Sequence, residues 1–366
     1  MFTPNQRLLD QLLQDGTVLM RRSSLLDQPP PPLASHFTWD KAEGMLLGLA
    51  IGDSLGNTTE SQMPDKRYAS HGEITDYLPN LYADNKKVGL PSDDSQMAFW
   101  TLEALLADGS LNPEHLLEVF SSRRIFGIGG AVQEAIGNYK QEVRPWYLCP
   151  SKSAGNCALM RIAPVLLPYL QHPSEAIWAD AALAALTTHN DAASLSACCA
   201  WVYLLWSLLG MEQPPSPQWW VDTYVKIARE FEGEATYNAK GVYSSYLGPL
   251  WHFVEEKLPK ALKRNLTIRQ ACDEWYSGAF LLETVPSVLY ILMKYAHDPE
   301  QALIRAVNDT VDNDTIAAVV GSAVGALHGA QALPLRWRQN LSGRTGAIDD
   351  GHIEKLIIQA HATYWH

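Results

Sequence analysis

Acidic residues gather at three places in this chain, and two of these places precede long apolar segments. Residues 92–95 (SDDS) stand before one apolar segment, and residues 312–315 (DNDT) stand before another. Asp53 and Glu60 lie at the end of a third. A single acidic pair at the start of a helix is usually a cap. Two such pairs before apolar helices indicate carboxylates that converge inside the fold.

Converging carboxylates are typical of a metal centre. They repel one another and lose hydration on burial unless a cation neutralises them. Oxygen ligands without cysteine or histidine suit a hard ion, so Mg²⁺, Mn²⁺ or Ca²⁺ is expected. The carboxylates are numerous enough for two ions, and paired ions can position a water molecule and substrate hydroxyl groups.

The elements that must position these carboxylates are helical. From residue 38 onward, apolar residues recur in segments of helical length, and alternating strand patterns are nearly absent. The expected helices are 38–56, 93–108, 113–121, 157–170, 175–187, 192–210, 219–231, 246–262, 278–296, 300–308 and 315–330. The simplest interpretation is one compact all-α domain over residues 38–366, a multi-helix bundle.

Two series of small residues recur every four positions. They are Gly44, Gly48, Gly52 and Gly56, and Ala317, Gly321, Gly325 and Gly329. A glycine inside a helix costs about 1 kcal/mol relative to alanine, so some interaction should offset it. Small residues at this spacing let two backbones approach closely. We expect two glycine-faced helices packed tightly in the core, against each other or against other helices; glycine-rich loops are the alternative.

Residues 1–37 form an N-terminal extension. Four leucines between positions 8 and 13 have helical spacing, which predicts one short amphipathic helix. Arg21 and Arg22 follow, and then the run Pro29–Pro32, which favours an extended conformation. This segment could be an arm that reaches a partner. Equally, it could be disordered or packed on its own domain.

Composition excludes several classes of protein. The chain has 366 residues with 28 Lys and Arg against 40 Asp and Glu, a net charge of −12, which argues against a general binder of nucleic acid or anionic membranes. Apolar residues make up 47%, so global disorder is excluded. Five scattered cysteines fit neither a disulfide framework nor a zinc site. A reducing, cytoplasmic location is expected.

Two uncharged segments, 192–210 and 315–335, are long enough to span a membrane. Both are rich in alanine, glycine and serine, and the second follows two aspartates. Buried central helices of a large helical domain are therefore expected, because a helix that is apolar all round must be buried. Residues 1–18 contain Asp10 and Asp15 and lack a long apolar run, so no signal peptide is expected.

Five motifs occur in the order of the ADP-ribosylglycohydrolases. They are Gly44–Gly56 followed by Glu60, then 92–97 (SDDSQM), 155–164 (GNCALMRIAP), 188–191 (THND) and 312–318 (DNDTIAA). Over roughly residues 40–337 the chain resembles this family, which includes the dinitrogenase-reductase-activating glycohydrolase. The resemblance implies an orthogonal helical bundle with a binuclear magnesium cleft. It also implies hydrolytic removal of ADP-ribose from a protein side chain.

The resemblance assigns roles to individual residues. The metal ligands, for two Mg²⁺ or alternatively Mn²⁺ ions, would be Ser92, Asp93, Asp94, Asp312, Asp314 and Thr315. The substrate pocket would be lined by Gly127, Gly129, Ser153, Gly155, Asn156 and His189. The candidates for catalytic proton transfer would be Glu60, Asp93 and Asp314, and the residues leave the choice among them open.

Simpler explanations exist for several of these residues. His189 could be a structural histidine, Asn156 a helix cap, Glu60 a surface residue and residues 127–130 any loop. The chain also departs from the family pattern at Ser92, Cys157, Thr310, Val311 and Asn313. No departure removes a carboxylate, so they affect the expected loop shape and substrate preference more than the metal.

Three functions follow as hypotheses. The first is hydrolysis of ADP-ribosylated protein side chains, with arginine as the preferred leaving group and serine or a free ADP-ribose derivative as alternatives. The second is immunity to an ADP-ribosyltransferase toxin, through hydrolysis or through an arm of residues 1–37 that blocks the toxin's active site. The third is a pseudoenzyme that only binds ADP-ribose, which the retained aspartates disfavour.

Overall fold

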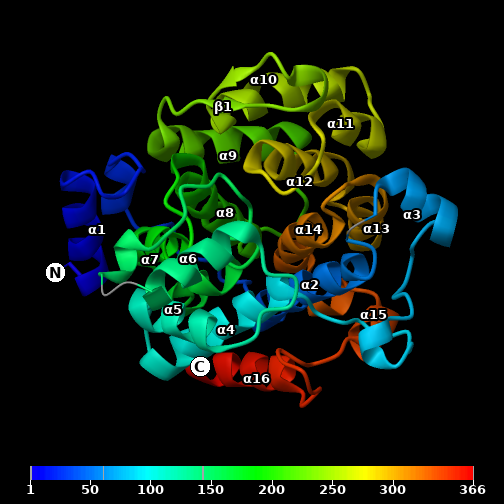
Figure 1. Ribbon diagram of the computed structural model, residues 1–366, viewed down its shortest axis with the longest axis horizontal. Coiled ribbons are helices and arrows are strands. Elements are labelled where there is room, and N and C mark those ends of the chain that lie inside the picture. Colours follow the sequence, from blue (N-terminus) through cyan, green and yellow to red (C-terminus); the bar gives the residue numbers. More distant parts are fainter. Residues whose placement is uncertain (1, 61, 142–143, 366) are drawn as a thin grey trace.

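The computed structural model describes residues 2–60, 62–141 and 144–365, and helices dominate them (Figure 1). The α-helices are α1 (Pro4–Gln14), α2 (Trp39–Asn57), α3 (Pro64–His71), α4 (Asp93–Asp108), α5 (Pro113–Ser122), α6 (Gly130–Gln141), α7 (Ala176–Leu186), α8 (Ala192–Leu209), α9 (Pro217–Glu232), α10 (Leu250–Lys263), α11 (Ile268–Trp275), α12 (Leu281–Tyr295), α13 (Pro299–Asp309), α14 (Asn313–His328), α15 (Leu335–Asn340) and α16 (His352–Tyr364). The predicted all-α fold is confirmed.

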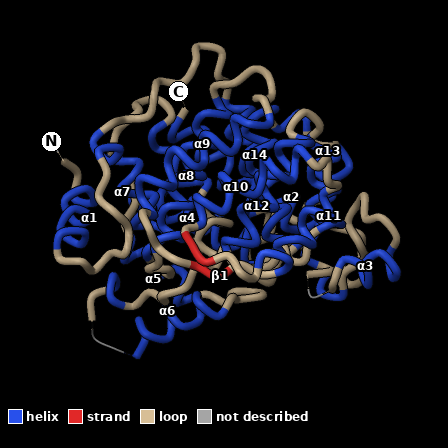
Figure 2. Tube along the Cα trace, turned by 90° about the horizontal axis from the view of Figure 1, so that it is seen from above, coloured by secondary structure: helices blue, strands red, loops and turns tan. Residues whose placement is uncertain are grey.

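Short elements complete the fold. The strands β1 (Tyr237–Asn238) and β2 (Leu247–Gly248) pair antiparallel, and they are the short red segments in Figure 2. The 3₁₀ helices are Ser24–Asp27, Leu81–Ala83, Trp146–Leu148, Ala163–Tyr169, Gly241–Tyr243 and Ala330–Ala332.

The expected α-helix over 157–170 is wrong. Turns follow Asn156, and a 3₁₀ helix then spans Ala163–Tyr169. Pro164 and Pro168 lie in this segment. Because proline has no N–H group to donate and clashes with the preceding turn, two of them favour a tight irregular path over an α-helix.

Helices α2 and α14 run antiparallel through the centre of the molecule, side by side in Figure 1. Their glycines face each other so closely that a Cβ atom on Gly48 would overlap the carbonyl oxygen of Gly321, and the reverse also holds. A Cβ on Gly52 would overlap the carbonyl of Ala317 in the same way. The glycine-faced helices predicted from the sequence are therefore confirmed, and they pack against each other.

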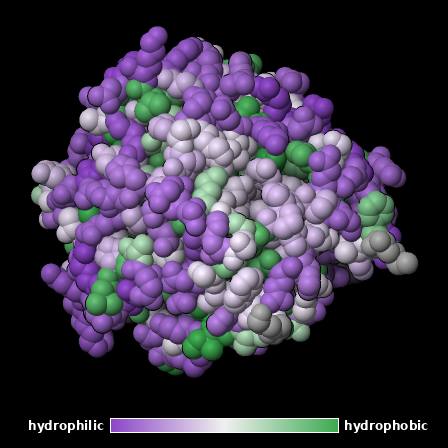
Figure 3. Space-filling model, turned by 180° about the vertical axis from the view of Figure 1, so that it is seen from behind, coloured by the Kyte–Doolittle hydropathy of each residue, from purple (hydrophilic) through white to green (hydrophobic). Residues whose placement is uncertain are grey.

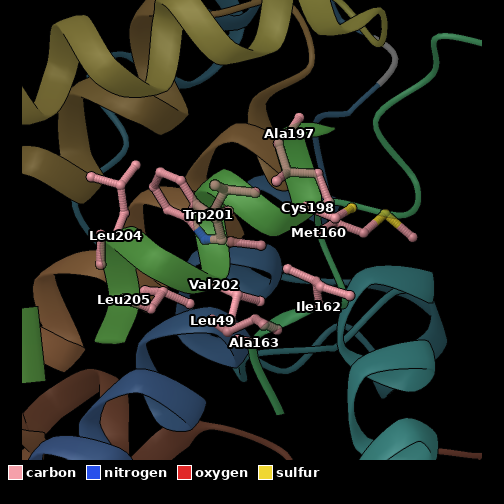
Figure 4. Packing of buried hydrophobic residues seen from close by; sticks show 14 of the residues in the cluster. Leu49, Met160, Ile162, Ala163, Ala197, Cys198, Trp201, Val202, Leu204 and Leu205 are labelled. Carbon is pink, nitrogen blue, oxygen red and sulfur yellow. The ribbon is translucent and has the colours of Figure 1, made fainter. Parts of the chain in front are cut away.

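Helix α8 forms the middle of the hydrophobic core. Its residues Trp201 and Leu204 point into a cluster that also includes Leu49 of α2, as Figure 4 shows. Of the described residues, α8 alone forms a helix long and apolar enough to cross a membrane, and 89% of it is buried inside the protein. The prediction of a buried core helix is confirmed here. The face in Figure 3 is mostly hydrophilic, with scattered hydrophobic residues.

The described part of residues 1–37 lies against the helical domain. Helix α1 packs on α7, at the left of Figure 1, with Leu9 and Leu12 buried between them. The proline-rich stretch is also tied down, since the indole N–H of Trp206 donates to the carbonyl of Pro31 at 2.8 Å. The predicted amphipathic helix is present, and its apolar side faces its own domain.

Asp180 of α7 anchors this extension and predicts a pH-dependent stability. Its buried carboxylate accepts hydrogen bonds from Asn5 Nδ2 at 2.7 Å and from the Tyr169 hydroxyl at 2.6 Å. Burial raises the pKa of Asp180 from 3.8 to about 6, although both hydrogen bonds act in the opposite direction. The folded protein therefore holds this proton more tightly than the unfolded chain. The stabilisation is complete below about pH 4 and is lost as the pH rises through 6.

In Asp180→Asn we expect that pH dependence to disappear. The free energy of unfolding is measured by urea titration at pH 4 and at pH 8. Its decrease between these two pH values should be about 3 kcal/mol smaller in the variant than in the parent protein. Equal pH profiles for the two proteins would show that Asp180 does not hold a proton in the folded state.

Candidate metal centre and active site

Asp53 of α2 fixes the start of α4. Its fully buried carboxylate accepts hydrogen bonds from the backbone N–H groups of Ser92, at 2.9 Å, and Ser95, at 3.1 Å. The hydroxyls of the same two serines donate to it as well, at 2.6 and 2.5 Å. The first N–H groups of a helix have no partner within the helix. Asp53 therefore caps α4 from another element and holds Asp93 and Asp94 against the ends of α2 and α14.

Three buried carboxylates from three helices meet at one point. Ligand atoms of Asp53, Asp94 and Asp314 all lie within 4.8 Å of one another. Asp314 reaches this point because Gly56, the last glycine of the series on α2, contacts the backbone of Asp314 in the first turn of α14. The Oδ1 atom of Asp94 is buried without a hydrogen-bond partner in the described residues. An orphaned buried carboxylate oxygen beside two further carboxylates fits a divalent cation.

The remaining acidic residues surround this point. Asp312, directly before α14, accepts a hydrogen bond from Asn156 Nδ2 at 2.6 Å. The pKa values of Asp93, Asp94 and Asp314 are raised well above the ordinary range, first by burial and then by the neighbouring carboxylates. In other words, these groups would retain protons unless a cation replaced them.

Glu60 lies at the exposed rim of this cluster. Desolvation of its carboxyl group, together with the charges of Asp312 and Asp53, raises its pKa from 4.5 to about 7. An acid with this pKa can both give and accept a proton near neutral pH.

All the carboxylates predicted from the sequence thus converge, together with the buried hydroxyl-bearing residues Ser92 and Thr315. Their roles as ligands and catalysts stay predictions. Asp53 was not among the predicted ligands. Its position directly after Gly52, in an otherwise apolar helix, was a signal that could have predicted a buried carboxylate. Its carboxylate serves first as the cap of α4.

The predicted substrate residues form one wall beside the carboxylates, which we call the glycine wall. It consists of Gly127, Gly129, Ser153, Gly155, Asn156 and His189. A Cβ on Gly127, where φ is +78°, would lie 3.2 Å from Asp93 Oδ1. A Cβ on Gly155 would lie 3.3 Å from both His189 Nε2 and Ser153 Oγ. A side chain at Gly127 would therefore fill space next to the cluster, whereas one at Gly155 would press on His189 and Ser153.

His189 presents a neutral ring to this wall. It is fully buried, and burial, assisted by the charge of Arg161, lowers its pKa to about 3. Its Nδ1 atom shares a 2.8 Å hydrogen bond with the Thr188 hydroxyl. Its Nε2 atom has no partner in the described part of the chain and faces Gly155. Nε2 is therefore a buried polar atom whose hydrogen-bonding capacity is left unused.

Two departures from the family pattern have visible consequences. The sulfur of Cys157 would lie 2.7 Å from a Cβ on Gly129, so the cysteine narrows the space there and requires glycine opposite it. The Asn313 amide donates to the carbonyl of Gly56 at 3.2 Å and to the Thr59 hydroxyl at 3.0 Å. Asn313 therefore ties the start of α14 to the end of α2.

Comparisons with known proteins show which family the chain is similar to. The family model of the ADP-ribosylglycohydrolases matches residues 34–364. The ADP-ribosyl-[dinitrogen reductase] glycohydrolase of Rhodospirillum rubrum is 26% identical over 331 residues, which cover 88% of this chain and 97% of that protein. The ADP-ribosylarginine hydrolase Tri1 of Serratia proteamaculans is 25% identical over 327 residues, covering 86% of this chain and 79% of that protein.

A solved structure described as an ADP-ribosylglycohydrolase-related protein complex has the same fold. Its TM-score to this chain is 0.64, at 24% identity, over 89% of this chain and 97% of that one. The family model covers most of the sequence, including every carboxylate of the cluster and every residue of the glycine wall. The chain belongs to the ADP-ribosylglycohydrolase family of enzymes.

Proposed function

We propose that this chain hydrolyses the bond between ADP-ribose and an arginine side chain of a modified protein, with magnesium as its cofactor. The observation that carries the proposal is the buried carboxylate cluster with its orphaned Asp94 oxygen. Oxygen-only ligands favour a hard ion such as Mg²⁺. Arginine is the preferred leaving group because a relative that matches 86% of this chain, Tri1 of Serratia proteamaculans, is named an ADP-ribosylarginine hydrolase.

In this proposal the glycine wall binds ADP-ribose. Gly127 lacks a side chain beside Asp93, so a diphosphate can approach the backbone of this loop. Asn156 is held in place by its hydrogen bond to Asp312, and His189 can bond a ribose or phosphate oxygen through Nε2. The terminal ribose is thereby held beside the carboxylates, where its glycosidic bond would be cleaved through an oxocarbenium-like transition state.

Proton transfer falls to the acidic residues at the rim. Glu60, with a pKa of about 7, can accept a proton from the attacking water or give one to the leaving nitrogen. Divalent ions bound by the cluster would supply charge neutralisation and a lowered pKa for water.

The direct test is release of ADP-ribose from an arginine-ADP-ribosylated protein. We expect release with Mg²⁺, loss of release with excess EDTA, and recovery when Mg²⁺ or Mn²⁺ is restored. A serine-linked substrate run in parallel should react at least about tenfold more slowly. Release that survives complete chelation would refute the metal requirement, and equal rates on serine would refute the arginine preference.

Toxin binding through residues 1–37 stays a prediction. In this conformation Leu9 and Leu12 are buried against the domain, so an arm would first have to detach. A truncated chain that keeps the full affinity for a purified ADP-ribosyltransferase toxin would remove this hypothesis.

A further inference from the structure

A pocket of about 490 Å³ opens beside the carboxylates, at Glu60 and Ser92. Glu60 and Ser92 line it on the side of the carboxylates, and Tyr82, which is 80% exposed, also lines it. Of the glycine wall, Gly127 lines this pocket, whereas Ser153–Asn156 and His189 do not. A substrate whose ADP-ribose occupies the glycine wall would therefore extend its protein part toward this second pocket.

Two arginines and a phenylalanine form the outer part of the pocket. The guanidinium carbons of Arg124 and Arg344 lie 5.3 and 5.5 Å from the centroid of the Phe126 ring. Stacking of this kind holds the guanidinium planes while their N–H edges stay available. Within the described residues neither guanidinium forms an ion pair, whereas the adjacent Arg123 pairs with Glu103. These two cationic side chains thus line the pocket of a chain whose net charge is −12.

Gln96 links the loops that carry these arginines to the carboxylate cluster. It lies two residues after Asp94 on α4 and is buried. Its side-chain oxygen accepts a hydrogen bond from the N–H of Phe126 at 2.8 Å. Its side-chain nitrogen donates to the carbonyls of Thr345, at 2.9 Å, and Arg124, at 3.3 Å. One amide thus joins both arginine-bearing loops to the helix that carries the carboxylates.

We propose that this pocket is the acceptor subsite of the enzyme, where Arg124 and Arg344 bind an acidic residue of the target protein that lies next to the ADP-ribosylated side chain. This inference rests on the proposed function, because it needs ADP-ribose on the glycine wall. Arginine forks bind carboxylates through paired, charge-assisted hydrogen bonds. Target proteins with a nearby aspartate or glutamate are then preferred over neutral ones.

Two arginine-ADP-ribosylated peptides that differ by one flanking residue, Glu or Gln, test the proposal. The parent enzyme should have a KM about tenfold lower for the Glu peptide, with similar kcat for both. In the double variant Arg124→Gln/Arg344→Gln this preference should fall to about one. The double variant Arg229→Gln/Arg264→Gln removes two exposed arginines from α9 and the end of α10, and it should keep the tenfold preference.

Three outcomes would overturn the proposal. They are equal KM values for the two peptides in the parent enzyme, a preference that survives Arg124→Gln/Arg344→Gln, and a loss of activity on free ADP-ribosyl-arginine as large as the loss on the Glu peptide. The last outcome would place ADP-ribose itself against the arginines.

Binding of the unmodified peptides, measured by fluorescence anisotropy with Mg²⁺ present, separates this inference from the proposed function. Tighter binding of the Glu peptide that depends on Arg124 and Arg344 would support the subsite even if neither modified peptide were hydrolysed. Absence of hydrolysis would then count against the proposed function alone. Equal binding of both peptides would count against the subsite.

Discussion

The double substitution Asp94→Asn/Asp314→Asn should abolish hydrolysis and, at the same time, stabilise the metal-free fold. The two carboxylates come from α4 and α14 and meet within 4.8 Å. Changes to groups that only support metal ligands cost about 10- to 100-fold in metal affinity or activity. Removing two carboxylates of the cluster itself should therefore lower kcat/KM by more than about 100-fold on an arginine-ADP-ribosylated protein.

The gain in stability follows from the raised pKa values. Burial and mutual repulsion raise the pKa of both carboxyl groups, so the folded state binds their protons more tightly than the unfolded chain. Their contribution to stability is complete below pH 4 and is lost as the pH rises through the raised values. At pH 7.5 in EDTA, asparagine at both positions should therefore raise Tm by several degrees.

Thermal unfolding with EDTA and with Mg²⁺ measures both effects. The parent protein should gain Tm on addition of Mg²⁺, because a ligand of the folded state stabilises it. The double variant should not respond. Asp222→Asn, which removes an exposed carboxylate on α9, is the matched control and should respond as the parent does. A normal Mg²⁺ response in the double variant would place the ion elsewhere.

The acidic part of the site could be predicted from local sequence. Residues 92–95 and 312–315 combine carboxylates with the start of apolar helices, and this contrast is visible without a structure. Asp53 was harder, because its partners on α4 are about forty positions away. Only the three-dimensional path shows that a carboxylate on one helix caps another.

The central helices could be predicted because their long apolar segments are visible in the sequence. The peripheral helices were missed. Helices α3, α6, α11, α15 and α16 were not expected from the sequence. Most of them expose much of their surface and carry a short apolar stripe, which is a weak signal. In α16, Ile353, Leu356, Ile357 and Ala360 have helical spacing, so that signal was available. The docking of α1 could not be inferred, because a leucine pattern specifies a helix face and not its partner.

Alanine at Gly48 or at Gly321 should destabilise the protein severely. The added methyl group would overlap a backbone carbonyl of the facing helix, and a backbone atom cannot rotate away as a side chain can. Overpacking a core usually costs about 1–3 kcal/mol. Because the obstacle here is backbone, we expect each substitution to lower the free energy of unfolding by at least about 3 kcal/mol in urea titrations.

Gly137→Ala on α6 is the matched control, since no atom lies within 4 Å of the Cβ position there. It should raise the free energy of unfolding by about 0.5–1 kcal/mol, because alanine is the better helix former. If Gly48→Ala changed stability by less than about 1 kcal/mol, close contact of α2 and α14 would be refuted.

Gly48→Ala also tests whether the close contact of α2 and α14 determines the geometry of the candidate metal site. Asp53 lies on α2 and Asp314 on α14, so the distance between their carboxylates depends on the separation of the two helices. Folded Gly48→Ala protein must accommodate the methyl group by moving the helices apart. Its Mg²⁺ affinity, from the Mg²⁺ dependence of Tm, should therefore fall relative to Gly137→Ala. An unchanged affinity would mean that the carboxylates adjust independently of the helix contact.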